Sequence, residues 1–135
     1  MKIIDRETGI ESITSLIHNA KEFVVIVSPY NDLGGWDRLK DIINEAAKKL
    51  KVSYYVRKGE GINGIEGIEA TIYEVPLLHA KMFFSEKEAI ISSGNLTNRS
   101  DINLFCRLEG DEYKQITDFF KRYIKSGAKT FKRGL

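Results

Sequence analysis

The run EFVVIVSPY, from Glu22 to Tyr30, strongly limits the folds that this chain can adopt. It is continuous, rich in β-branched residues and closed by Ser28-Pro29, which is typical of a short strand buried on both faces. Apolar residues recur at helical spacing from about residue 9 to 21 before it, and from about residue 35 to 50 after it. A strand of this kind between two amphipathic helices predicts a sheet that is covered by helices.

Strand patterns continue through the second half of the chain. They are KVSYYVR (51–57), IEATIYEV (68–75), HAKMFF (79–84), AIISS (89–93) and LFCRLEG (104–110). The polar residues 85–88 suit a hairpin turn between HAKMFF and AIISS, and a final amphipathic helix follows residue 110. We therefore expect an α/β fold with one mixed β-sheet sandwiched by helices, in a single domain that spans residues 1–135.

The residues that could bind metal or form disulfides are few. The chain has one cysteine, Cys106, and two histidines, His18 and His79. One cysteine cannot form an intrachain disulfide, and these residues are too few for the usual four-ligand zinc site, so Cys106 is expected to be a small buried residue. No segment has the roughly 18 apolar residues of a membrane helix, and charge occurs too early for a secretory signal. We expect a cytoplasmic protein with no metal, no cofactor and no membrane partner.

Basic residues gather near the C-terminus, although the net charge is only +2. After Tyr113 the chain has seven basic residues and one acid, Asp118; the basic residues are Lys114, Lys121, Arg122, Lys125, Lys129, Lys132 and Arg133. Such a segment can contact phosphate backbones. Considered alone, this basic segment is better explained as a solvated helix face followed by a short disordered tail, because a net charge of +2 does not indicate a nucleic-acid-binding protein.

A second feature that could bind phosphate is the glycine-rich segment KGEGINGIEG, residues 58–67. It lacks the Gly-Lys-Ser/Thr ending of a P-loop, and it leads into a strand pattern instead of a helix whose N-terminus could hold an anion. We interpret it as a flexible connection.

The polar residues of LLHAKMFFSEKEAIISSGNLT, from Leu77 to Thr97, form a more specific pattern. His79 and Lys81 are two residues apart on a predicted strand, so they point to the same face. The next strand should bring Ser93 and Asn95 beside them. A lone strand histidine is usually a structural residue, but an ammonium, a hydroxyl and an amide around an imidazole suit a phosphate group and acid–base or nucleophilic chemistry.

The same block resembles the signature of the phospholipase D superfamily, H-x-K-x4-D-x6-G-S-x-N. His79-Ala80-Lys81 and Ser92-Ser93-Gly94-Asn95-Leu96-Thr97 carry this resemblance, and the Ser-x-Asn-Leu-Thr ending is common among the nuclease-like members. The Val-Ser-Pro-Tyr end of the first strand and the order of elements also resemble one half of that fold. The resemblance implies that nearly the whole chain is one phospholipase D-like half-domain.

The chain departs from this signature at three places. Glu86 stands in place of the aspartate, with an interval to the Ser-x-Asn element that is one residue shorter. Ser92 stands where the family usually has glycine. The family often has a downstream Asn-x-Glu pattern whose acid orients the histidine; Asn103-Leu104-Phe105 occupies that place, and the acid is missing. These departures affect residues around His79, while His79, Lys81 and Asn95 are kept.

The resemblance implies a metal-independent phosphodiesterase, most simply a nuclease. His79, Lys81 and Asn95 would be catalytic, and Ser93 and Glu86 would bind phosphate or support the site. The family combines two motifs around one active site and this chain has one, since His18 lies in HNAK without a lysine two residues on. Two copies must therefore form a homodimer in which one His79 forms a phosphohistidine and the other acts as acid and base.

Two alternatives stay open at this stage. The chain could act on lipids or other phosphodiesters, although nothing resembles an interfacial anchor. It could also be a non-catalytic module that binds nucleic acid or mediates assembly, and the missing acid near Asn103 favours this reading. The sequence does not decide between DNA, RNA and lipid as the substrate.

Overall fold

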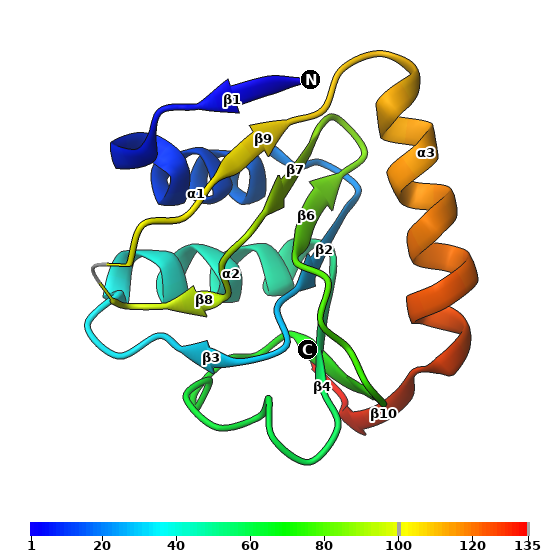
Figure 1. Cartoon of the computed structure of the whole chain (residues 1–135). Helices are drawn as coiled ribbons and strands as arrows, with labels where there is room; N and C mark the ends of the chain where they lie inside the picture. Colours follow the sequence, from blue (N-terminus) through cyan, green and yellow to red (C-terminus); the bar gives the residue numbers. More distant parts are fainter. Residues whose placement is uncertain (100, 135) are drawn as a thin grey trace.

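In residues 1–99 and 101–134, which the computed structural model describes, eight strands form one mixed sheet (Figure 1). Their order across the sheet is β1-β9-β7-β6-β2-β4-β5-β10. The strands are β1 (Lys2–Ile4), β2 (Phe23–Val27), β4 (Lys51–Arg57), β5 (Thr71–Val75), β6 (Met82–Ser85), β7 (Ala89–Ser92), β9 (Phe105–Arg107) and β10 (Lys129–Lys132). A separate parallel pair consists of β3 (Asn31–Asp32) and β8 (Leu96–Thr97).

Strand β2 lies near the centre of the sheet, as its continuous apolar run predicts. It pairs in parallel with β4 and antiparallel with β6, and β4 pairs in parallel with β5. Residues 24–27 of β2 are buried, because alternate side chains enter the two apolar layers on opposite faces of the sheet. The antiparallel hairpin β6–β7 is also confirmed.

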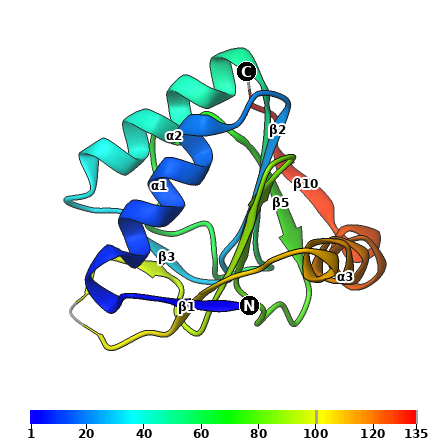
Figure 2. The same ribbon diagram turned by 90° about the horizontal axis from the view of Figure 1, so that it is seen from above.

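Helices cover both faces of the sheet (Figure 2). Helices α1 (Gly9–Asn19) and α2 (Asp37–Lys49) lie on one face. On the other face lies α3 (Asp111–Phe119), which continues as a π-helical turn η2 (Phe120–Ile124) and a 3-10 turn η3 (Lys125–Gly127). A short 3-10 turn, η1 (Arg6–Thr8), precedes α1. The predicted α/β fold, a mixed sheet sandwiched by helices, is therefore confirmed.

The two faces hold separate apolar cores. The core under α1 and α2 includes Ile13, Leu16, Ile17, Ile26, Ile43, Tyr54 and Phe83. The smaller core under α3 includes Val25, Val27, Tyr55, Leu78, Phe84, Phe120 and Ile124. Two helices thus cover one face and a single helical segment covers the other, which leaves part of the second face open.

Two segments differ from their sequence-based interpretations. The C-terminal tail forms the edge strand β10, which pairs antiparallel with β5, so it is not the disordered tail that its basic composition suggested. Cys106 is buried in β9, as expected. Among the described residues, no helix is both long and apolar enough to cross a bilayer.

The glycine-rich segment is packed tightly against the chain that follows β2. A Cβ atom at Gly61 would lie 2.2 Å from the Pro29 carbonyl oxygen, and one at Gly64 would lie 2.1 Å from the Asn31 carbonyl oxygen. Gly64 also has a positive φ of 84°, which disfavours other residues. The glycines therefore allow a close backbone approach, so this segment is more than a flexible connection.

Candidate active site

His79 and Lys81 lie in the extended segment that leads into β6, and their side chains are in contact. The Lys81 Nζ atom is 2.7 Å from His79 Nδ1. The imidazole is exposed and the lysine is partly buried. The expected pairing with the neighbouring strand reaches this point, because Ser92 N donates to the Lys81 carbonyl oxygen. The two side chains lie together as predicted, but β6 begins at Met82 and not at His79, so both residues precede the strand.

When Lys81 is charged, its contact with His79 selects which ring nitrogen carries the proton. An ammonium group only donates, so Nδ1 accepts and the proton of the neutral ring lies on Nε2. Burial lowers the pKa of Lys81 from its usual range, which makes the ammonium readier to take an anionic ligand or to give up a proton. In this state the ring of His79 is neutral and can donate a hydrogen bond through Nε2.

Ser93 and Gly94 form a tight turn where β7 ends. The Ser93 hydroxyl oxygen accepts a hydrogen bond from Leu104 N at 2.8 Å and lies 3.5 Å from Asn103 Oδ1. A Cβ atom at Gly94 would lie 2.3 Å from the Asn103 side chain, so a larger residue there would have to displace that side chain. Asn103 therefore does lie against the Ser-Gly-Asn turn, and the Ser93 hydroxyl helps to hold the two loops together.

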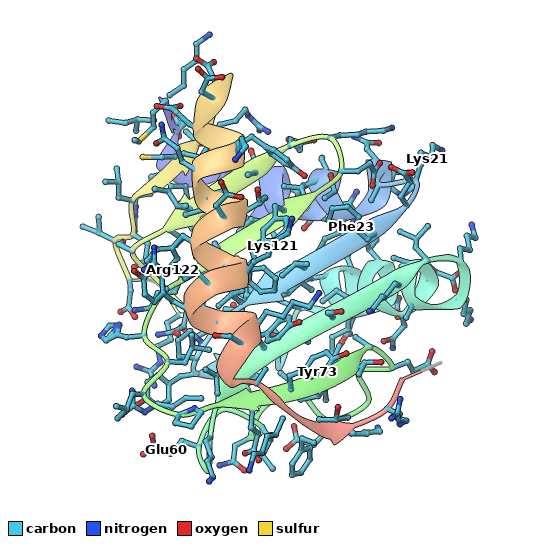
Figure 3. All side chains as sticks on the ribbon, turned by 90° about the vertical axis from the view of Figure 1, so that its right-hand side faces the viewer. Lys21, Phe23, Glu60, Tyr73, Lys121 and Arg122 are labelled. Carbon is cyan, nitrogen blue, oxygen red and sulfur yellow. The ribbon has the colours of Figure 1, made fainter. Side chains whose placement is uncertain are left out.

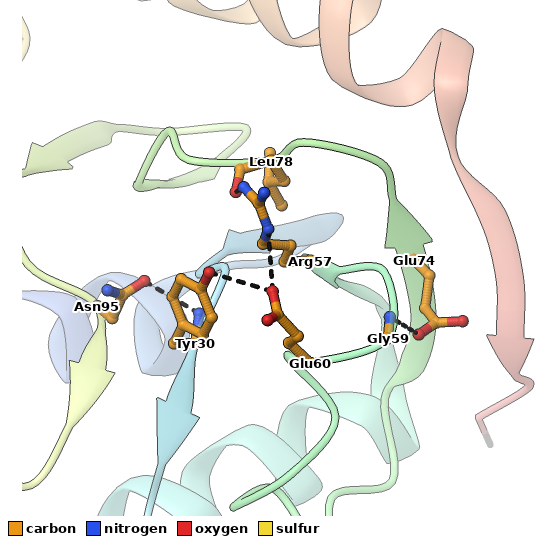
Figure 4. Close-up of polar contacts among 7 residues, drawn as sticks. All are labelled: Tyr30, Arg57, Gly59, Glu60, Glu74, Leu78 and Asn95. Atoms are coloured by element: carbon orange, nitrogen blue, oxygen red, sulfur yellow. Dashed lines mark hydrogen bonds and ion pairs between the residues drawn. The ribbon is translucent and has the colours of Figure 1, made fainter.

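Asn95 is fixed to the end of β2. Its Oδ1 atom accepts a hydrogen bond from Tyr30 N at 3.1 Å (Figure 4). Ser28 Oγ accepts a hydrogen bond from Leu96 N at 2.8 Å, which secures the same junction. Because Oδ1 faces Tyr30, the Nδ2 group points the other way, where it can donate to a ligand.

A network of polar contacts connects Asn95 with the chain beside His79 (Figure 4). The Tyr30 hydroxyl donates to Glu60 Oε2 at 3.2 Å, and Arg57 Nε forms an ion pair with the same oxygen at 3.1 Å. Arg57 also donates to the Leu78 carbonyl oxygen at 3.1 Å, one residue before His79. The network thus joins the two segments that carry the candidate catalytic residues.

Sequence reasoning missed the members of this network, Tyr30, Arg57 and Glu60. Tyr30 follows parallel strand β2 and Arg57 ends parallel strand β4, so both lie at the carboxyl ends of strands, where α/β sheets commonly bind ligands. The glycine-rich segment did carry a signal for Glu60. Several neighbouring glycines often mean that the backbone packs closely against another segment, which here brings Glu60 near Tyr30.

The loops around Asn95 enclose a cavity of about 380 Å³. Its lining residues are Tyr30, Ser93, Gly94, Asn95, Thr97, Arg99, Asp101 and Asn103. Most of them are polar, and Arg99 adds a positive charge near the Asn95 amide. Asp101 adds a carboxylate to the same lining and offsets the charge of Arg99, so the cavity is suited to a polar group.

Glu86 does not join this group, because it lies at the opposite end of β6. Its carboxylate accepts hydrogen bonds from the backbone N–H groups of Lys21, Glu22 and Phe23 at 2.9–3.2 Å. Burial alone would raise the pKa of this carboxyl group, but these N–H groups and its own outweigh burial and lower the pKa to about 2. Glu86 fixes the start of β2 and supports the fold at a distance from His79.

Comparison with solved structures agrees with the fold described above. No protein-family model matches the sequence, and no curated protein is significantly similar to it. The structure is similar to NucT from Helicobacter pylori, with a TM-score of 0.71, 12% sequence identity and 96% of each chain covered. It is also similar to Nuc from Salmonella typhimurium, a phospholipase D family member, with a TM-score of 0.69, 11% identity, and 91% of this chain and 90% of that chain covered.

The archaeal chromatin protein TrmBL2, which shows a novel mode of DNA binding, is a further similar structure. Its TM-score is 0.66 at 10% identity, over 94% of this chain and 53% of TrmBL2. The chain therefore has the fold of the phospholipase D superfamily, which confirms the resemblance drawn from the sequence. The similarity covers nearly the full lengths of NucT and Nuc.

Proposed function

We propose that this protein is a metal-independent phosphodiesterase, most simply a nuclease, whose active site is shared by two copies of the chain. The observation that carries the proposal is the 2.7 Å contact between Lys81 and His79 at the sheet end that also holds Asn95. This combination offers a nucleophile, a cation and a neutral donor to one phosphodiester.

The reaction requires two histidines in different protonation states. Nε2 of one His79 attacks phosphorus, so a P–N bond forms while the bond to the leaving oxygen breaks. The partner's His79 donates its proton to that oxygen and then takes a proton from water. The resulting hydroxide attacks phosphorus and breaks the P–N bond, which restores both histidines.

The Lys81 contact can control which ring nitrogen of His79 is nucleophilic. With Lys81 donating to Nδ1, the ring is neutral and carries its proton on Nε2, so it must take up a second proton and become imidazolium before it can act as the acid. When a bound phosphate takes the ammonium as its own partner, Nδ1 is free to hold the proton and Nε2 becomes nucleophilic. The substrate would thereby select the nucleophilic form of one of the two rings.

Exposed apolar side chains near the candidate site support its position beside a second copy. Leu77, two residues before His79, is 82% exposed and has a positive φ of 59°, which is unusual for leucine. Ile102 and Leu104, on the loop that carries Asn103, are 83% and 52% exposed. Burial of these side chains across a twofold axis would stabilise a dimer and bring two His79 residues together.

Nucleic acid is the favoured substrate because basic side chains lie at this end of the sheet. Arg99 lines the cavity beside Asn95, and Lys58 follows β4 in an exposed position. Such side chains hold a phosphate backbone without reading sequence. The similarity to a DNA-binding chromatin protein is consistent with this choice and also favours a second candidate, a DNA-binding module without catalysis.

The test is cleavage of fluorescently labelled single-stranded DNA, duplex DNA and RNA in EDTA, with phosphatidylcholine vesicles assayed in parallel. The proposal predicts that a nucleic acid is cut and that His79→Ala abolishes cutting. His18→Ala is the matched control, because the exposed His18 lies on α1, outside the candidate site, and its loss should leave the rate unchanged.

Four results would overturn the proposal. Cleavage that depends on added magnesium would contradict the histidine mechanism, and cleavage of the vesicles alone would move the activity to lipids. DNA binding without cleavage by the folded wild-type protein would favour the non-catalytic module. An acid-stable protein phosphate after rapid mixing would point to a nucleophile other than histidine, since phosphohistidine is labile in acid.

A further inference from the structure

A second hollow lies on the α3 face of the sheet, away from His79. It has a volume of about 520 Å³ and lies between the strands β2, β4 and β5 and the helical segment from α3 to η3. Six aromatic side chains line it: Phe23, Tyr55, Tyr73, Phe84, Tyr113 and Phe120. Figure 3 looks onto this face, with Phe23 and Tyr73 on the strands and Lys121 on the helix beside them. We call this hollow the α3 groove.

The pairing register of the strands explains why the α3 groove is hollow. One row across the sheet joins Val25, Ser53 and Thr71, which have small side chains. The next row on the same face joins Val27, Tyr55 and Tyr73, and the two tyrosine rings stack with centroids 4.7 Å apart. Small side chains beside large rings leave a trough, which the single helical segment covers only in part.

Positive charge borders this aromatic trough. Lys51 lies at the start of β4, Lys121 in η2 and Lys125 in η3, and all three line the groove and are exposed. The acid nearest to Lys121 in sequence, Asp118, forms an ion pair with Lys114 at 2.6 Å. Among the described residues, no aspartate or glutamate lines the groove. The groove therefore combines apolar walls with three lysines that form no ion pair within the described residues, although Asp118 lies near enough to Lys121 for its ammonium to help Lys114 to lower the Asp118 pKa.

We propose that the α3 groove binds a small amphipathic anion, namely a single acyl chain with a carboxylate head group. The chain lies along the trough over Val25 and Ser53 between the aromatic rings, and the carboxylate lies at the three lysines. The volume is in the range of small-molecule sites, which are largely apolar with a few polar groups that set orientation. Charge complementarity selects this occupant over a neutral or cationic one.

This site is distinct from the candidate active site. Phe23 and Lys51 lie at the amino ends of β2 and β4, whereas Tyr30 and Arg57 lie at their carboxyl ends. The proposal for the α3 groove therefore does not depend on the proposed phosphodiesterase, and each can fail without the other.

The experiment is a titration of the ¹⁵N-labelled full chain with sodium decanoate, followed by two-dimensional NMR below the micelle concentration. We expect saturable shifts of the Ser53, Tyr73 and Lys121 amides. Decyltrimethylammonium, which has the same chain and the opposite charge, should bind at least about tenfold more weakly, since several ion pairs are replaced by repulsion. The Lys121→Gln/Lys125→Gln double variant should lower the decanoate affinity about tenfold, because it removes two of the three cations.

Ser53→Leu fills the trough and should also weaken decanoate binding about tenfold or more, while nucleic-acid cleavage stays unchanged. If this variant does not fold, the lysine double variant carries the test, because both lysines are exposed. Equal binding of the anion and the cation, or unchanged binding by the lysine variant, would overturn the proposal. If the same amide signals shift when the protein concentration is raised without decanoate, the groove instead binds a second copy of the chain.

Discussion

Strand β6 has a charged group at each end, and the two ends hold these groups in opposite ways. At the start of the strand, Lys81 contacts His79, whose ring is exposed and whose Nε2 has no hydrogen-bonding partner within the described residues. Beyond the other end, Glu86 accepts hydrogen bonds from the backbone of three residues at the start of β2. One end keeps its polar atoms available for a ligand, and the other uses them to hold the sheet together.

Under the proposed function, this contrast explains how a small protein can present a reactive site without losing its structure. Groups that must bind a ligand cannot be fully paired within the fold, so their contribution to stability is small. Stability has to come from other contacts. Part of it comes from the hydrogen bonds that the backbone at the start of β2 donates to Glu86, beyond the other end of β6. Substitutions at the two ends should therefore separate activity from stability.

The largest effect is expected for Lys81→Met. In the proposed mechanism the ammonium stabilises the transition state, so its loss should lower cleavage about 10²- to 10³-fold. The free energy of unfolding should change little, since the substitution removes a partly buried charge and keeps an apolar stem. Activity assays and denaturant unfolding measure the two quantities. Lys87→Met, in the exposed turn of the same hairpin, is the matched control and should leave both quantities unchanged.

At the opposite end, Glu86→Ala should reduce stability and leave the activity of the folded protein intact. The three backbone N–H groups lose a charged acceptor, which costs about 2 kcal/mol, or about 30-fold in the unfolding equilibrium. Urea unfolding measures the loss, and cleavage is assayed well below the midpoint. A variant that is as stable as wild type but inactive would contradict the division between the two ends.

A smaller effect is expected for Glu60→Gln. The change weakens the ion pair with Arg57 and the bond from Tyr30, so the segments carrying Asn95 and His79 lose a common support. We expect kcat to fall about tenfold with little change in KM, because positioning is lost while binding groups remain. Glu66→Gln, in the same glycine-rich segment, is the control. A change in thermal stability with unaltered kcat would assign Glu60 a purely structural role.

The smallest effect concerns pH. Because the pKa of Glu86 in the folded state is about 2, below its usual value of 4.5, its ionised form is favoured by folding. The stability it contributes is complete above about pH 4.5 and is lost as the pH falls towards 2. The difference in stability between wild type and Glu86→Gln should therefore shrink over this range in acid-unfolding curves. A constant difference across these pH values would contradict the role of the ionised carboxylate.

Patterns within short segments predicted most of this structure correctly. The continuous run in β2 and the two-residue spacing of His79 and Lys81 are local features, and both gave the right result. The role of Glu86 could not be predicted in this way, because its partners lie more than 60 residues away in the sequence. The role of Glu60 could not be predicted for a similar reason, since its approach to Tyr30 depends on how Gly61 and Gly64 pack against the chain that follows β2.

Edge strand β10 could not be predicted from the sequence for a different reason. Its basic, exposed residues carry no alternating apolar pattern, and the strand forms because β5 has a free edge that needs hydrogen-bonding partners. The α3 groove could not be predicted either, since it arises from the register that aligns Val25, Ser53 and Thr71 across separate strands. Register between parallel strands cannot be read from the segments themselves.

The central claim, that two His79 residues from two chains form one active site, is tested most directly by mixing subunits. Wild-type and His79→Ala chains are denatured, combined in varying proportions, refolded together and assayed for cleavage in EDTA. The shared site predicts that activity follows the square of the wild-type fraction, so an equal mixture retains about one quarter, since only that share of random pairs has two intact chains. Activity that falls in direct proportion to the wild-type fraction would contradict the shared site.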